Sequence, residues 1–199
     1  MSDADAVALA EVGLLRGPDD RLRCSWAGAA EDYVAYHDQE WGRRLAGDDA
    51  LFERLCLEAF QSGLSWLTIL RRREGFRRAF AGFSVAAVAA FDESDVERLL
   101  ADTGIIRNRA KIDAAIGNAR LAAQLPDGLS ALLWSFAPPP RPRPRTRADV
   151  PATSPESVAL AKDLRRRGFR FVGPTTAYAL MQATGMVDDH IVGCHAGAA

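Results

Sequence analysis

The sequence has few cysteines and no long apolar run. Three cysteines among 199 residues are too few for a fold built on disulfides, and their scarcity is typical of a reducing cytosol. No stretch reaches the roughly 18 consecutive apolar residues of a transmembrane helix. The N-terminus is acidic, whereas a secretory signal begins with positive charge. These absences predict a cytoplasmic protein with no membrane partner.

Net charge is also nearly absent, because the chain carries a formal charge of −1. This value excludes a uniformly basic nucleic-acid coat, but it leaves a local basic face open. Residues 1–62 hold 13 acidic and 6 basic residues, a net charge of −7. Residues 141–170 hold 9 basic and 3 acidic residues, a net charge of +6. The near-zero net charge of the chain therefore conceals an acidic N-terminal region and a basic patch at 141–170.

The composition, 48% hydrophobic and 26% charged, is typical of a globular protein. Residues 1–20 are expected to form a poorly ordered lead-in with a short helix. Helical signals dominate from about Asp48, and no stretch alternates in the way of a strand, so the sequence predicts an all-α protein. Between 137 and 155, prolines alternate with arginines, which predicts an extended, irregular loop.

Capping residues and apolar spacing place the helices. Asp48 or Asp49 is expected to cap the first, and Ser65 the second. Ser94 and Glu97 read as a capping box for a helix that ends near Gly104. The remaining expected helices cover 84–88, 107–123, 155–168 and 174–183.

Four of the six cysteine and histidine residues fall into two pairs with metal-ligand spacing: Cys24, His37, His190 and Cys194. Thiolate and imidazole are the ligands that zinc prefers, and a set of four leaves no open position for water, so such a zinc would be structural. The other interpretation is that the thiols are small core residues and the histidines are surface groups; spacing alone leaves both open. Cys56, between two leucines, is expected to be a core thiol, and His195 could compete as a ligand.

Five of the seven Trp and Tyr residues lie between 26 and 66: Trp26, Tyr33, Tyr36, Trp41 and Trp66. Such rings either fill a core or form a stacking pocket for a planar ligand. Glu58 interrupts an apolar run nearby in the sequence. Glu58 is either a partly buried carboxylate or a solvent-facing partner of Arg54 one turn earlier.

A basic helix end at 165–167 leads through a turn with Gly168 and Gly173 into Pro174. Glycine allows a close backbone approach, and the free N–H groups of a helix start can hold a phosphate, as in the helix-hairpin-helix modules that grip DNA backbones. The alternative is an ordinary corner with solvated arginines. The neighbouring proline- and arginine-rich segment and the arginines at 71–73 favour a phosphate-binding surface.

Five strings of residues occur in one order along the chain. They are Arg23-Cys24-Ser25-Trp26, Tyr36-His37-Asp38-Gln39-Glu40-Trp41-Gly42, Gln61-Ser62-Gly63-Leu64-Ser65-Trp66, Gly104-Ile105-Ile106-Arg107 and Asp189-His190-Ile191-Val192-Gly193-Cys194. With them, the chain closely resembles the bacterial 3-methyladenine DNA glycosylase I family of the helix-hairpin-helix superfamily. The resemblance extends from Arg23 to Cys194.

The resemblance implies an all-α helix-hairpin-helix glycosylase fold, with residues 21–199 as one domain of two helical lobes. It implies one structural zinc per chain, which joins the N- and C-terminal regions. The residue roles that it implies are the following: Cys24, His37, His190 and Cys194 as zinc ligands; Glu58 as the carboxylate that recognises the damaged base; Tyr36 and Trp66 as stacking rings, with Trp26 and Tyr33 lining the pocket; Gly63 and Leu64 as the segment that enters DNA; and the hairpin with Gly168, Gly173 and Thr175 as the DNA-backbone clamp.

The implied activity is hydrolysis of the N-glycosidic bond of N3-methyladenine in double-stranded DNA by a bacterial, monomeric enzyme. A carboxylate complements the cationic base, whereas normal adenine offers no charge to offset its desolvation. The nucleotide must be flipped out of the duplex. Neither lysine is placed as a Schiff-base nucleophile, so no lyase step is expected. Asp188 and Asp189 are expected to orient His190 or to cap a turn. The competing functions are a non-catalytic sensor of alkylated bases and a zinc hydrolase.

Overall fold

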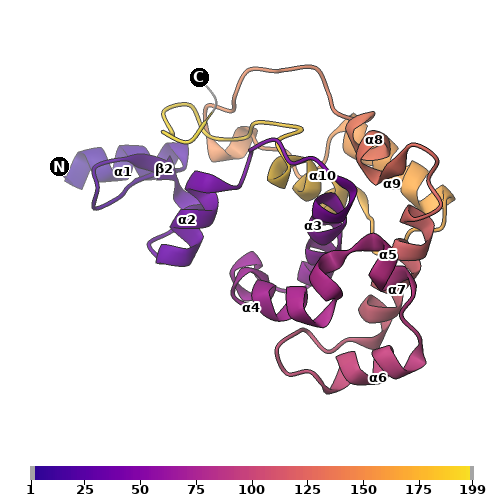
Figure 1. The fold of residues 1–199 in the computed structure, drawn as a ribbon. Helices are drawn as coiled ribbons and strands as arrows, with labels where there is room; N and C mark the ends of the chain where they lie inside the picture. Colours follow the sequence, from indigo (N-terminus) through magenta and orange to yellow (C-terminus); the bar gives the residue numbers. More distant parts are fainter. Residues whose placement is uncertain (1–2, 198–199) are drawn as a thin grey trace. The chain divides into compact units, whose positions relative to one another are not determined.

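The computed structural model describes residues 3–197 and is mainly helical (Figure 1). Its α-helices are α1 (Asp3–Val12), α2 (Glu31–Gln39), α3 (Asp48–Gln61), α4 (Trp66–Ala79), α5 (Val85–Ala89), α6 (Glu93–Ala101), α7 (Arg109–Ala122), α8 (Gly128–Trp134), α9 (Pro155–Arg166) and α10 (Pro174–Ala183). Short 3₁₀ helices cover Ser25–Ala27, Ala81–Phe83 and Arg147–Asp149. The predicted all-α class is confirmed.

Two strands were not expected, β1 (Leu14–Arg16) and β2 (Leu22–Cys24). They pair antiparallel, with Leu14 opposite Cys24. Three residues per strand are too few for an alternating pattern to be visible in the sequence. The pair follows α1, which is the short helix expected in the lead-in.

The chain forms two compact units. The first, which we call the N/C unit, contains the residues up to 44, 138–152 and the residues from 181 onward. The second, the central unit, contains residues 45–137 and 153–180. Within residues 3–197, no helix is long and apolar enough to cross a membrane.

The central unit is built around α3, which is buried along most of its length. Every residue of α3 from Leu51 to Phe60 except Glu53 is buried. Four phenylalanine rings contact one another in sequence, starting from Phe60 of α3, which lies at a centroid distance of 4.7 Å from Phe76 in a tilted arrangement. Phe76 stacks on Phe80, and Phe80 is parallel to Phe83 at 5.4 Å. A helix enclosed in this way also buries the carboxylate of Glu58.

Several helix starts follow the predicted caps. The Ser65 side chain accepts a hydrogen bond from Thr68 N at the start of α4, and Ser84 does the same at α5. Ser154 caps α9, whose first residue is Pro155. In each case a short hydroxyl side chain satisfies an N–H group that has no acceptor within the helix.

Two predicted caps are wrong. The cap of α6 is Asp92, paired with Asp95 in a capping box, so the helix begins before Ser94. The N-cap residue of α3 is Gly47, so neither Asp48 nor Asp49 caps this helix. Both lie in its first turn and accept hydrogen bonds from other segments: Asp49 from Val85 N and Asp48 from Ser130 N. A carboxylate can serve a distant N–H group as well as its own helix, and sequence spacing does not distinguish these uses.

Two helices, α2 and α8, were not predicted. Neither start carries a side-chain capping bond. The predicted helix at 107–123 begins instead at Arg109, where Asn108 caps it, and the one expected to reach Gly168 ends at Arg166. These differences concern boundaries and short elements, which lack strong local signals.

Candidate functional site

The four predicted metal ligands come together in the N/C unit. Cys24 ends β2, His37 lies in α2, and His190 and Cys194 lie in the segment after α10, which we call the C-terminal loop. All four are buried, and their ligand atoms lie within 4.8 Å of one another. The alternative in which the histidines are surface groups is therefore wrong. The group could hold a metal ion.

The spacing of the ligand atoms fits a tetrahedral metal. Cys194 Sγ lies 3.5 Å from both His37 Nε2 and His190 Nδ1, and Cys24 Sγ lies 3.8 Å from His190 Nδ1. A tetrahedral ion bound to sulfur at about 2.3 Å and to nitrogen at about 2.05 Å separates these atoms by about 3.6 Å. These three distances are close to that spacing, so the ligand atoms suit a tetrahedral metal.

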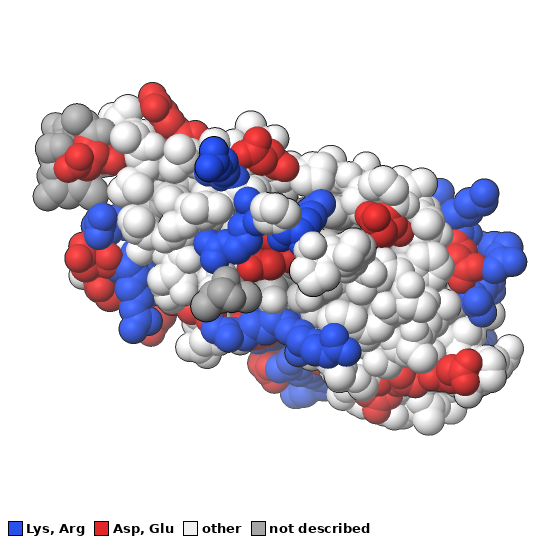
Figure 2. Space-filling model, turned by 90° about the horizontal axis from the view of Figure 1, so that it is seen from above, with Lys and Arg blue, Asp and Glu red and all other residues white. Residues whose placement is uncertain are grey.

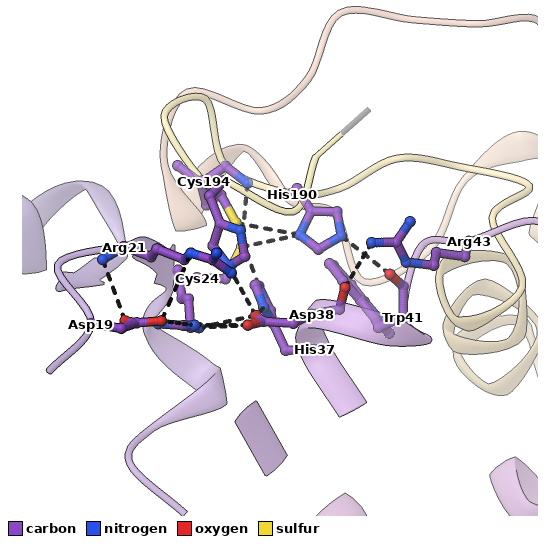
Figure 3. A network of polar contacts seen from close by, with 12 residues as sticks. Asp19, Arg21, Cys24, His37, Asp38, Trp41, Arg43, His190 and Cys194 are labelled. Carbon is purple, nitrogen blue, oxygen red and sulfur yellow. Dashed lines mark hydrogen bonds and ion pairs between the residues drawn. The ribbon is translucent and has the colours of Figure 1, made fainter. Parts of the chain in front are cut away.

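The ring nitrogens that face away from this group are both held (Figure 3). His37 Nδ1 lies 2.8 Å from Asp38 Oδ1, and His190 Nε2 lies 3.2 Å from the Trp41 carbonyl oxygen. Both partner oxygens are hydrogen-bond acceptors, so the outer nitrogen of each ring is the one that carries the N–H and donates. The inner nitrogens, His37 Nε2 and His190 Nδ1, are thereby left as acceptors suited to a metal.

Asp38 is the centre of the network around the ligands. Arg23 donates to it at 2.7 Å and to Asp19 at 2.7 Å, and His195 Nε2 lies 3.1 Å from it. Desolvation alone would raise the pKa of Asp38, but the hydrogen bonds from Arg23, His37 and His195 outweigh it and lower the pKa to about 2. His195 thus lies outside the group of four and binds the carboxylate that orients His37.

The two aspartates before His190 have structural partners. Asp188 Oδ1 accepts from the His190 backbone N–H at 3.1 Å, which caps the turn. Asp189 is buried and pairs with Arg141 at 2.8 Å and with Gln182 Nε2 at 2.9 Å. The expected turn-capping role is confirmed for Asp188, whereas the His190 ring is oriented by a backbone carbonyl.

The proline- and arginine-rich segment at 138–152 packs against the C-terminal loop. Arg143 donates to the carbonyl oxygens of His190 at 3.1 Å and Ile191 at 2.9 Å, and also contacts that of Cys194 at 3.4 Å. A planar guanidinium with five N–H donors can satisfy several carbonyls at once. The segment is therefore an extended strap that fixes the loop carrying two of the four ligands.

Four of the five clustered aromatic residues lie together in the N/C unit. Trp26 contacts Tyr33 at a ring-centroid distance of 5.2 Å, Trp41 at 4.8 Å and Tyr36 at 6.4 Å. The cluster continues into the metal group, because Trp26 also packs edge-on against His37 at 5.1 Å. These rings therefore pack directly against one of the four candidate metal ligands.

Glu58 and Trp66 belong to the central unit. Glu58 is 5% exposed, so its interpretation as a solvent-facing residue is wrong. Among the described residues, no hydrogen bond to its carboxylate contributes to its pKa; burial raises that pKa to about 7, and the charge of Arg54 opposes the shift. Arg54 lies over the Trp66 ring at 5.4 Å, a cation–π contact.

The segment at 62–65, between α3 and α4, is exposed. Gly63 has a φ of +84°, a value that favours glycine, and no atom lies within 4 Å of the Cβ that a side chain would add there. Leu64, the next residue, is 41% exposed. An apolar side chain thus stands at the tip of a turn that lies open to solvent.

The predicted hairpin lies between α9 and α10. Gly168 has a φ of +98°, and the backbone of Arg170 is held by Asn118 through two hydrogen bonds of 2.9 and 3.0 Å. A Cβ at Gly173 would lie 3.3 Å from Arg165 Nη2, so glycine lets this guanidinium approach the start of α10. Thr175 is exposed in the first turn of α10, where N–H groups have no acceptor within the helix.

The basic patch at 141–170 is smaller than its net charge indicates. Arg141 and Arg143 are engaged by the C-terminal loop, and Arg166 and Arg167 both pair with Asp163. In the view of Figure 2, basic and acidic side chains are interspersed on the surface. Counting charges along the sequence could not separate the arginines that are occupied within the fold from those that face solvent.

The contacts of three residues in the site region were not predicted. These residues are Asp38, Arg143 and Lys111. Lys111 Nζ donates to the carbonyl oxygens of Phe60 and Ser62, beside the exposed segment at 62–65. A signal existed for two of them, since Asp38 follows a ligand directly and Lys111 is one of only two lysines in an arginine-rich chain.

Comparison with known proteins identifies the family. The profile described as methyladenine glycosylase matches residues 26–197. The chain is 46% identical to DNA-3-methyladenine glycosylase 1 of Escherichia coli over 177 residues, which cover 86% of this chain and 95% of that protein. It is 40% identical to DNA-3-methyladenine glycosylase of Haemophilus influenzae, covering 86% and 96% of the two chains.

A solved structure agrees in fold. It is that of 3-methyladenine DNA glycosylase I from Staphylococcus aureus, determined to explain 3-methyladenine recognition. It superposes with a TM-score of 0.85 at 32% identity and covers 89% of this chain and 97% of the other. With the profile match extending over most of its length, this chain belongs to the methyladenine glycosylase family.

Proposed function

We propose that this chain is a DNA repair N-glycosylase that hydrolyses the N-glycosidic bond of N3-methyladenine, releases the free base and leaves an abasic site. The observation that carries the proposal is the buried Glu58 carboxylate, whose pKa is raised by desolvation to about 7. Such a group binds a cation strongly once it is ionised. The names of the relatives at 46% and 40% identity support the same activity.

Glu58 distinguishes the damaged base from normal adenine by charge. Methylation at N3 makes the base cationic, so its entry into the pocket compensates the buried carboxylate. Normal adenine would leave that carboxylate desolvated and uncompensated, at a cost of several kcal/mol. The same positive charge already weakens the glycosidic bond, so the enzyme needs to bind and orient the nucleotide more than to activate the leaving group.

Tyr36 and Trp66 are the rings that we assign to stacking on the base, and Trp26 and Tyr33 those that line its pocket. An aromatic face binds a cationic purine through both stacking and cation–π attraction. The support within the structure is the tight packing of Trp26, Tyr33 and Tyr36 in the N/C unit.

A monofunctional reaction fits the lysines of the chain. Lys111 is bonded to two backbone carbonyl oxygens and is buried, so it is unsuited to form a Schiff base. Lys162 is exposed on α9. Hydrolysis by water, without a covalent enzyme intermediate, is therefore the reaction we propose.

We assign zinc to the group of four cysteine and histidine ligands, with one ion per chain. Two thiolates and two imidazoles are a closed donor set, which leaves no coordination position for a reacting water. When bound, the ion cross-links β2, α2 and the C-terminal loop. It would be held by Cys24, His37, His190 and Cys194. Other residues would carry out the reaction.

The strap supplies a prediction about this ion. Arg143→Met removes the donors to three carbonyls of the C-terminal loop, so zinc release to a chromophoric chelator should be about tenfold faster or more. Arg145→Met is the matched control, because Arg145 is an exposed arginine of the same segment. Equal release rates for the two variants would contradict the role given to Arg143.

We propose double-stranded DNA as the macromolecular substrate of a monomeric enzyme. The hairpin offers glycine at 168 and 173 and the first-turn N–H groups around Thr175, which suit a backbone phosphate. Gly63 and Leu64 suit entry into the base stack at the lesion, because an exposed apolar side chain there can occupy the space of an extruded nucleotide.

The test is to incubate the purified protein with methylated duplex DNA and to measure free base by chromatography. Release of N3-methyladenine, without strand cleavage until alkali is added, is the expected result. Binding of the same DNA without base release would establish the competing non-catalytic sensor instead.

A further inference from the structure

The turn that carries Leu64 is constrained at its start. Leu64 N donates to Gln61 O at 2.6 Å, and Gly63 supplies the positive φ that closes the turn. Ser65 then caps α4, so the turn is fixed at its end as well. Between these two points, residues 62–64 are exposed. Their position therefore depends on what holds the C-terminal end of α3.

Lys111 holds that end. Its Nζ donates to Phe60 O at 2.8 Å and to Ser62 O at 2.7 Å. The last carbonyls of a helix have no intrahelical partner, and a cation near them is favoured by the helix dipole. The two accepting residues lie on either side of Gln61, where α3 ends and the turn begins. A single ammonium group thus joins the helix to the turn.

The lysine itself has a fixed position. It lies in the first turn of α7, where its backbone N–H bonds the capping Asn108 side chain at 3.1 Å. Its side chain is 8% exposed and extends from α7 to the end of α3. An apolar residue would fill this space without the cost of burying a charge. The position of the ammonium between two carbonyls therefore indicates a role beyond filling the core.

We propose that Lys111 is a positioning residue of the glycosylase, which fixes the 62–65 turn so that Leu64 is presented to DNA in one orientation. The inference rests on the proposed function, since it assigns to that turn its role at the lesion. Lys111 acts on extrusion of the nucleotide from duplex DNA, whereas recognition of the free base does not depend on it.

The variants are Lys111→Met, which keeps a side chain of similar length but removes the charge, and Lys111→Arg, which keeps a cationic hydrogen-bond donor. Lys162→Met is the matched control, because it removes the only other lysine, which is exposed on α9. Three quantities are measured for each: the single-turnover rate of base release from methylated duplex DNA, the affinity for free 3-methyladenine by tryptophan fluorescence, and amide hydrogen exchange over 60–66.

For Lys111→Met, we expect the single-turnover rate to fall by about 100-fold, as displacement of a positioning element by an ångström can cause. Affinity for the free base should stay within about twofold, and exchange over 60–66 should become about tenfold faster as the turn loses its anchor. Lys111→Arg should recover most of the rate. Lys162→Met should match the wild type in all three measurements.

A double-mutant cycle tests whether Lys111 acts through Leu64. If it does, Lys111→Met combined with Leu64→Ala should release base no more slowly than the slower single variant. Additive losses would overturn the proposal, and so would a parallel loss of free-base affinity, which indicates general misfolding. Absence of base release by the wild type would refute the proposed function; the exchange measurement then still decides whether Lys111 fixes the turn.

Discussion

Glu58→Gln is expected to lower the rate of N3-methyladenine release by about 100-fold or more. Glutamine keeps the size of the side chain but removes the charge that compensates the cationic base, and loss of one partner of a buried charge pair costs about 3 kcal/mol. Single-turnover release from methylated duplex DNA measures this loss. Release at the wild-type rate would remove Glu58 from its assigned role.

The same substitution is expected to stabilise the protein above neutral pH. Burial raises the pKa of Glu58 from 4.5 to about 7, so the folded state holds its proton more tightly than the unfolded state does. The contribution of protonated Glu58 to the free energy of unfolding is fully present below pH 4.5 and is lost as the pH rises through about 7. In the ionised form, folding therefore costs about 3 kcal/mol more, and glutamine avoids this cost.

Urea unfolding at pH 5 and pH 8 measures this effect. The stability gained by Glu58→Gln over the wild type should be small at pH 5 and large at pH 8. Glu53→Gln is the matched control on the same helix, because Glu53 pairs with Arg77 at 2.8 Å and gains nothing from losing its charge. An equal response of both variants to pH would show that burial of Glu58 is not the cause.

The rate of base release should rise with pH, whereas the stability of the wild type falls. The substrate base is cationic at any pH tested, whereas Glu58 loses its charge as the pH falls through about 7. Base release should therefore decline toward acid with the apparent pKa of this carboxylate, and the decline should be absent from the residual activity of Glu58→Gln. The molecule thus gives up stability at neutral pH for a charge that the substrate requires.

Removal of the proposed zinc is the second change with a large expected effect. Without an ion, the N/C unit buries two thiols and two imidazoles that were arranged around it, and β2, α2 and the C-terminal loop lose their cross-link. We expect Cys194→Ser, or treatment with a chelator, to lower the Tm by about 10 °C or more, since structural metal binding contributes directly to folding. Differential scanning calorimetry with parallel metal analysis measures both quantities.

Cys56→Ala is the control for this experiment, because Cys56 is buried in the apolar α3 and lies outside the group of four. That variant should keep one zinc per chain. Replacement of zinc by cadmium should leave the rate of base release unchanged, as expected of a structural ion. A rate that changes with the identity of the metal would favour the competing zinc hydrolase.

The sequence predicted the chemically distinctive residues better than the contacts that hold them. The rarity of cysteine and histidine drew attention to Cys24, His37, His190 and Cys194, which the structure brings together. Glu58 was noticeable because it interrupts an apolar run, and the structure buries it. Their supporting contacts run largely to backbone carbonyls, such as those of Trp41, His190 and Phe60. A carbonyl belongs to every residue, so no sequence pattern marks which one a side chain will reach.

The misjudged arginines have the same explanation. Arg141 and Arg143 lie in a segment whose composition predicted an extended basic loop; residues 137–146 contain no helix or strand, whereas Arg147–Asp149 form a 3₁₀ helix. Their charges, however, are used by Asp189 and by three carbonyls of the C-terminal loop. These partners lie more than 40 positions away along the chain, so only the fold brings them together.

The division of the chain into units has a consequence for synthesis on the ribosome. The central unit takes its first stretch from one continuous segment, 45–137, whereas the N/C unit needs residues from both ends of the chain. Cys24 and His37 are translated more than 150 residues before His190 and Cys194. During translation, β2 and α2 therefore expose the Cys24 thiol, the His37 imidazole and nearby aromatic rings, and this unit can close only after residues 190–194 have been translated.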